Sequence, residues 1–92
     1  YALRSEVNWF DYFPTTVNDT FCNEQIVASA ARAGLSVRQR PMPFKFGEDF
    51  GWFTQAFPGA MFGLGAGQYT PALHNPDYDF PDEIIDTGVR LF

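Results

Sequence analysis

The only histidine of the chain, His74, lies between a glycine-rich run and a cluster of aspartates in the stretch GLGAGQYTPALHNPDYDF, residues 63–80. Imidazole binds metals and carries protons near neutral pH, so His74 is the residue with the clearest chemical potential. A zinc site needs three or four protein ligands. Here the companions are carboxylates, since the chain has no second histidine and a single cysteine. On residue type alone, a loop histidine without a metal is the simpler interpretation, and both stay open at this point.

The carboxylates have a structural and a chemical interpretation. Asp79, Asp82 and Glu83 precede an apolar stretch, where the positive end of a helix dipole favours them. Glu48 and Asp49 precede another predicted helix in the same way. Either of these two would become an acid, a base or a substrate contact only by pointing into a cleft. Stabilisation of helix starts is the simpler interpretation for most of these residues.

The glycines in residues 63–67 suggest a phosphate-binding loop at first sight. No predicted helix follows them directly and no Lys-Ser/Thr pair appears, which excludes a P-loop. They indicate instead a close approach of the backbone to a strand or a substrate. Cys22 lies on the apolar stripe of a predicted helix, so it is expected to be a small core residue and not a nucleophile.

Three helices are predicted to position these groups. The first covers residues 20–34, where Asn18 or Asp19 can cap the start and a glycine ends the apolar pattern. The other two cover residues 46–57 and 81–92, each with acids near its start and apolar residues at helical spacing.

Three strands are predicted between these helices. Residues 1–13 and 35–40 carry branched or aromatic residues in partial alternation, and residues 60–67 form a short apolar run with too many glycines for a helix. Alternating strands and helices imply right-handed crossovers and a mainly parallel sheet. We therefore expect a small α/β fold of the three-layer type with about three helices.

Composition limits the kinds of partner. The net charge is −5, with no run of Lys or Arg, which argues against nucleic acid and against an anionic membrane. No apolar run reaches the ~18 residues that a membrane span needs. A single cysteine fits a reducing compartment, so we expect a cytoplasmic protein. The 18% aromatic content predicts either a dense core or an exposed apolar surface through which the chain self-associates.

Four motifs in a fixed order are more specific than any single residue. They are FPTTVNDT, GEDFGWFTQAFPGAMFGLGAG, LHNPDYDFPDE and the closing GVRLF. Together they resemble the C-terminal part of the M20 family of metallo-amidohydrolases and peptidases, in particular the branch that hydrolyses N-acyl amino acids, hippurate-like and aminobenzoyl-glutamate-like amides. The resemblance implies that residues 1–12 are the last strand of an inserted lid domain. Residues 13–92 would then be the C-terminal segment of a zinc-peptidase-like catalytic domain.

The resemblance also implies a site with two divalent metal ions, zinc or manganese, that hydrolyses a small N-acyl amino acid or related amide. His74 corresponds to the last metal ligand of the family, and the general-base glutamate is expected upstream. Gly65, Gly67 and Glu48 would lie along the substrate cleft. The 92 residues alone would then be inactive and would not hold the ions stably.

A protein of a different class is also compatible with the composition. The chain would be a stand-alone, non-catalytic, aromatic-rich α/β module that binds a protein partner. Its binding face would include Phe44, Phe46, Trp52 and Phe53. Metal content and amidase activity separate this alternative from the hydrolase.

Overall fold

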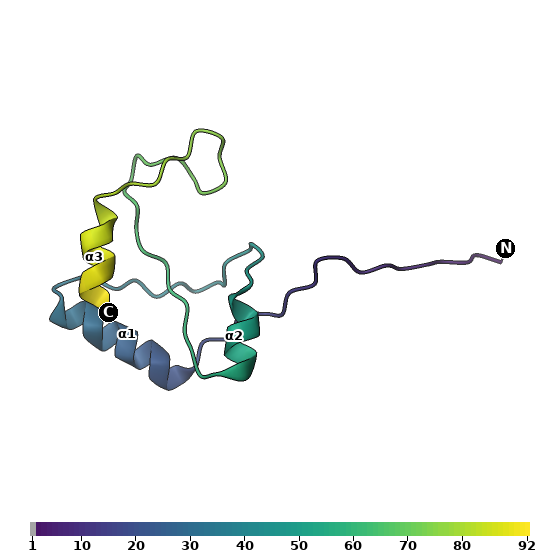
Figure 1. Cartoon of the computed structure of the whole chain (residues 1–92), viewed down its shortest axis with the longest axis horizontal. Helices are drawn as coiled ribbons and strands as arrows, with labels where there is room; N and C mark the ends of the chain where they lie inside the picture. Colours follow the sequence, from purple (N-terminus) through teal and green to yellow (C-terminus); the bar gives the residue numbers. More distant parts are fainter. Residues whose placement is uncertain (1) are drawn as a thin grey trace.

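The computed structural model describes residues 2–92, which form three helices joined by long irregular segments (Figure 1). The helices are α1 (Thr20–Arg32), α2 (Phe50–Ala56) and α3 (Ile84–Leu91). Helices α1 and α3 lie side by side, and the N-terminal segment extends away from all three. Tyr1, the first residue of the predicted N-terminal strand, lies outside the described residues.

Helix α1 begins and ends where the local sequence predicts. The side chain of Asp19, and not that of Asn18, accepts the first-turn hydrogen bond, from the backbone amide of Cys22 at 2.9 Å. At the other end, the amides of Gly34 and Leu35 return to carbonyls of the last turn at 3.1 and 2.9 Å. Gly34 has φ +70°, the left-handed conformation of a Schellman cap. Both predicted helix boundaries are thereby explained.

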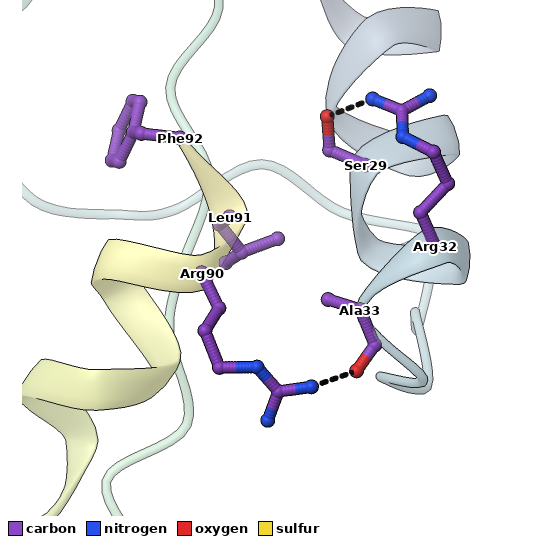
Figure 2. Close-up of a pocket in the computed structure, with 6 residues that line it drawn as sticks. All are labelled: Ser29, Arg32, Ala33, Arg90, Leu91 and Phe92. Carbon is purple, nitrogen blue, oxygen red and sulfur yellow. Dashed lines mark hydrogen bonds between the residues drawn. The ribbon is translucent and has the colours of Figure 1, made fainter.

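Helix α3 contacts the C-terminal part of α1 (Figure 1). Along the apolar stripe predicted for α1, Cys22, Ile26 and Ala33 are half-buried and Ala30 is only 4% exposed. Near the C-terminal ends of both helices, the guanidinium group of Arg90 donates to the backbone carbonyl of Ala33 at 2.7 Å (Figure 2). This bond satisfies a carbonyl that the end of α1 leaves without a helical partner.

Helix α2 packs against the chain just before α1. Gly51 and Pro14 are both buried, and they lie so close that a side chain at Gly51 would overlap the backbone of Pro14. The rings of Tyr12 and Trp52 meet edge to face with their centroids 5.9 Å apart. Residues 12–14 therefore dock on α2 although they are far from it in sequence.

The predicted sheet is wrong. Residues 2–13, 35–40 and 60–67 form no strand, and no strand occurs anywhere in residues 2–92, so the fold is a three-helix arrangement and not an α/β fold. The physical reason is that a strand exists only when its N–H and C=O groups pair with a neighbouring strand. These segments make no such ladder with one another. The same correction applies to the α/β fold expected of a stand-alone module.

Much apolar surface stays exposed. The chain exposes 8519 Å², whereas a compact domain of this length would expose about 5,400 Å². Its radius of gyration is 17.7 Å, against about 12 Å for a compact domain. Trp9 and Phe10, for example, are 84% and 82% exposed. Among the described residues, no helix is both long enough and apolar enough to span a membrane.

Candidate functional site

His74 lies in a loop, residues 68–82, that projects beyond α3 and away from α2 (Figure 1). Two successive turns shape the tip of this loop. The amide of Asn75 donates to the carbonyl of Ala72 at 3.0 Å, and the amide of Tyr78 donates to the carbonyl of Asn75 at 3.0 Å. His74 is the third residue of the first turn, and Pro76 is the second residue of the next, a position that proline favours.

The backbone of His74 is in an unusual conformation. Its φ is +72°, in the left-handed region that few residues other than glycine adopt. The residue is exposed, and its imidazole makes no hydrogen bond to any other described residue. An exposed imidazole held by a tight turn has both ring nitrogens available to a ligand. The chemistry that this arrangement supports is metal ligation or proton transfer.

The structure does not gather further ligands around His74. Within residues 2–92 there is no group of three or more His, Cys, Asp or Glu side chains placed to hold a metal ion. A catalytic zinc ion takes three protein ligands. The described residues therefore do not form a complete metal site among themselves.

Gly67 lies at the stem of the His74 loop and borders a hollow of about 580 Å³. The hollow lies between residues 67–71 and 79–83, so that the two stems of the loop form its walls. Asp79, Asp82 and Glu83 are among the lining residues, and His74 is not. These three carboxylates therefore lie beside a hollow in addition to preceding α3.

Gly65 lies in the segment that leads to this hollow. A side chain added at Gly65 would meet nothing within 4 Å, so this part of the backbone faces open space. The predicted role of Gly65 and Gly67 as a substrate-binding wall remains a prediction that this geometry allows.

Glu48 lies far from the His74 loop. It precedes α2, which lies apart from that loop in Figure 1, and one oxygen of its carboxylate accepts a hydrogen bond from the amide of Phe50 at 3.3 Å. In this position the carboxylate stabilises the start of α2. The structure thus does not bring Glu48 together with His74, Gly65 or Gly67, and its proposed substrate contact stays a prediction.

Cys22 is a poor nucleophile in this fold. Burial raises the pKa of its thiol, and the hydrogen bond and negative charge of Asp19 raise it further. The same contact lowers the pKa of Asp19, chiefly because the backbone amide of Cys22 donates to its carboxylate. A protonated, half-buried thiol agrees with the predicted packing role of Cys22.

A second hollow, of about 400 Å³, lies between the C-terminal ends of α1 and α3 (Figure 2). It is lined in part by two arginines. Arg32 donates to the hydroxyl of Ser29 at 2.8 Å, and Arg90 donates to the carbonyl of Ala33. In Figure 2 the two guanidinium groups lie apart, each turned to its own partner. Because they do not converge on one point, this hollow is not organised as an anion site.

Sequence reasoning missed the role of Asn18. It was considered only as a cap of α1, yet its side chain bonds both backbone groups of Met61, 43 residues away. The contact of Arg90 with Ala33 was missed too. A lone Asn and a lone Arg carry no signal of a partner so distant in sequence. Only their places in the motifs FPTTVNDT, which contains Asn18, and GVRLF, which contains Arg90, could have drawn attention to them.

The chain is similar in sequence to proteins that are named as hydrolases. An N-acetyldiaminopimelate deacetylase of Pediococcus pentosaceus is 31% identical over 87 residues, which cover 95% of this chain and 22% of that enzyme. Two uncharacterized hydrolases of Staphylococcus aureus, from strains MRSA252 and USA300, are 37% and 28% identical over 97 residues. Each of these matches covers 100% of this chain and 25% of the relative.

The family follows from a broader match. The sequence model of peptidase family M20/M25/M40 matches residues 4–92, nearly the whole chain. The chain therefore belongs to this family, and the resemblance to M20 enzymes is confirmed. It spans about a quarter of the length of the relatives it matches. No solved structure matches it.

Proposed function

We propose that this chain is one segment of a metal-dependent amidohydrolase that hydrolyses the amide bond of N-acyl amino acids, with His74 as a metal ligand. The observation that carries the proposal is the exposed imidazole of His74 at the tip of a tight turn, in a chain of the M20 peptidase family. A relative named as an N-acetyldiaminopimelate deacetylase supports an N-acyl substrate.

The proposed role of His74 is limited and definite. One neutral ring nitrogen would bind one of two divalent ions, zinc or manganese. When bound, such ions polarise a carbonyl group and lower the pKa of water, which is the chemistry an amide hydrolysis needs. The turn from Ala72 to Asn75 keeps His74 exposed, and the remaining ligands would have to come from outside residues 2–92.

The backbone of Gly65 and Gly67 would form one wall of the substrate cleft. Without side chains, these residues let a substrate approach the main chain closely. Their amide and carbonyl groups could then bind the polar groups of an N-acyl amino acid. Glu48 has a weaker claim to substrate contact, because its carboxylate already stabilises the start of α2.

A chimera tests the proposal. This chain would replace the segment of the Pediococcus deacetylase to which it aligns, and the chimera would be assayed for bound metal and for hydrolysis of N-acetyldiaminopimelate. The His74→Asn variant should lose metal and lower kcat by more than about 100-fold, because removal even of residues that only orient a metal ligand costs about 10- to 100-fold. Asparagine tolerates a positive φ, so the turn should survive.

The matched control is Asp77→Asn in the same loop, which removes a charge from another exposed residue and should leave metal content and activity nearly unchanged. If the His74→Asn chimera keeps its metal and its activity, His74 is not a ligand. In that case the proposal fails.

A second candidate function is a protein-binding module, favoured by one group of exposed aromatic residues. Phe44 and Phe46 stack with their ring centroids 5.0 Å apart, and the guanidinium of Arg40 lies 4.6 Å from the centre of the Phe44 ring. Trp52 and Phe53 are 49% and 62% exposed.

Two results would favour this second function. One is a chimera that binds no metal and has no hydrolase activity. The other is a captured protein partner whose binding is lost on the Phe53→Ser substitution.

A further inference from the structure

The side chain of Asn18 binds the backbone of Met61 at both ends. Its Nδ2 donates to the carbonyl of Met61 at 2.8 Å, and its Oδ1 accepts from the amide of Met61 at 2.9 Å. Next to it, the backbone amide of Asp19 donates to the carbonyl of Gly59 at 2.8 Å. Three hydrogen bonds thus join the start of α1 to residues 59–61.

Beyond Met61 the chain has few other fixed points. Among the described residues, the backbone groups of residues 62–65 make no backbone hydrogen bond. The next polar contact is the hydroxyl of Thr70, which donates to the carbonyl of Ala66 at 2.5 Å. Leu64 reaches α3, where its Cδ2 atom would be 3.7 Å from a side-chain carbon added at Gly88. Asn18 is therefore the hydrogen-bonded anchor that precedes the glycine-rich segment.

Exposure alternates along this segment. Phe62, Leu64 and Ala66 are half-buried, whereas every residue between and after them is an exposed glycine: Gly63, Gly65 and Gly67. Of the three glycines, Gly65 faces open space, whereas a side-chain carbon added at Gly63 would lie 3.3 Å from the Phe44 ring and one at Gly67 would lie 3.3 Å from the hydroxyl of Thr70. A shift of the chain by one residue would place Leu64 or Ala66 where the backbone of Gly65 is now open.

We propose that Asn18 is a positioning residue that fixes this register. By satisfying both backbone groups of a single residue, Met61, it selects the arrangement in which Gly65 faces open space. A shift of one residue would break both bonds at once. This inference rests on the proposed function, in which Gly65 and Gly67 form a wall of the substrate cleft, and it adds the residue that presents that wall.

Nuclear magnetic resonance of the 92-residue chain tests the register directly. In Asn18→Ala, the amide of Met61 should exchange with solvent at least about tenfold faster, since a tenfold change corresponds to the loss of a modest hydrogen bond. The amide shifts of Gly63, Gly65 and Gly67 should change, and the cross-peak between Leu64 and Gly88 should disappear. Amide shifts within α1 should stay nearly constant.

The conservative variant Asn18→Asp keeps an acceptor for the amide of Met61 and loses the donor to its carbonyl. It should restore the protection of that amide and the cross-peak between Leu64 and Gly88 only in part, because a carboxylate oxygen then faces the carbonyl oxygen of Met61 in place of the donor. The control is Asn23→Ala, an exposed asparagine of α1 whose side chain makes no hydrogen bond to other described residues. This control should change neither signal.

Two results would overturn the proposal. One is an Asn18→Ala variant in which the glycine shifts and the Leu64 cross-peak do not change. The other is equal loss of all helical signals in Asn18→Ala and Asn18→Asp, which would make Asn18 a general stability residue. Because no metal or substrate is present in this test, it stands apart from the chimera, whose failure would instead refute the hydrolase function.

Discussion

Replacing Gly51 with alanine should separate a steric effect from a helix-propensity effect. A side-chain carbon built at Gly51 would lie 3.0 Å from the carbonyl carbon of Pro14 and 3.1 Å from its Cγ, and closer still to its carbonyl oxygen. Ordinary contacts between carbon atoms are about 3.5–4.0 Å. Since the neighbour is largely backbone, α2 would have to move away from residues 12–14.

Gly88 provides the matched control, because it also lies inside a helix. A carbon built there would be 3.7 Å from Leu64, an ordinary contact. Both substitutions gain about 0.5–1 kcal/mol from the higher helix propensity of alanine. That gain cancels in the comparison, which leaves the overpacking cost at Gly51 of about 1–3 kcal/mol. Gly88→Ala should stabilise the chain, and Gly51→Ala should be less stable than Gly88→Ala by this amount.

Urea unfolding measures the difference. Trp52 reports on the affected contact through its edge-to-face packing with Tyr12. Trp9, which is 84% exposed, would first be replaced by phenylalanine so that only one tryptophan emits. If Gly51→Ala proves as stable as Gly88→Ala, with unchanged Trp52 fluorescence, then Pro14 and α2 do not pack as described here.

Two further substitutions test the start of α1 and its surroundings. The lowered pKa of Asp19 means that its ionised form stabilises folded α1. This stability is present above the unfolded-state pKa of about 3.9 and is lost as pH falls through the lower folded-state pKa. Asp19→Asn, a neutral cap, should therefore remove part of the loss of helical ellipticity that the unmodified chain shows below about pH 4; identical pH profiles would contradict this. The hydroxyl of Thr16 is buried without a hydrogen-bond partner among the described residues. Thr16→Val should raise the free energy of unfolding by about 1 kcal/mol, as measured by urea unfolding, and Thr16→Ser, which keeps the hydroxyl, should give no such gain.

The helices could be predicted because their signals are local. The cap at Asp19 and the left-handed Gly34 lie within a few residues of the ends of α1. Helices α2 and α3 begin a few residues later than predicted, since residues 46–49 and 81–83 precede them as turns and bends. An i to i+3 bond from the amide of Ile84 to the carbonyl of Pro81, for example, forms a turn before α3.

The sheet could not be predicted in the same way, because a strand depends on partners distant in sequence. Branched and aromatic residues in residues 35–40 and 60–67 favour a strand. Their pattern says nothing about whether a neighbour is present to bind their backbone groups. In this fold the backbone amide and carbonyl of Met61 bind the side chain of Asn18, where in a sheet they would bind the backbone of a neighbouring strand. Asn18 binds the backbone of Met61 alone.

The candidate site has the same limitation. The turn around His74 is local, and Pro76 and the aspartates indicate it in the sequence. Metal ligands, in contrast, come from separate segments, so spacing within 92 residues cannot reveal a set that those residues do not contain. Only the combined order of several motifs indicated the family, and the match over residues 4–92 confirms it.

Bonds from side chains to backbone, more than buried apolar contacts, connect the described parts of this chain. Asn18 joins α1 to Met61, and Arg90 joins α3 to the end of α1. Among residues 2–92, no large side chain is fully buried. Such bonds are directional, so they fix where segments lie even when the core is small. The His74 loop has turns of its own, and within residues 2–92 its backbone hydrogen bonds all lie inside the loop or at the start of α3. If His74 binds a metal in the chimera as proposed, the ion should restrict the motion of this loop, so that amide exchange at Asn75 and Tyr78 is slower with metal than without it.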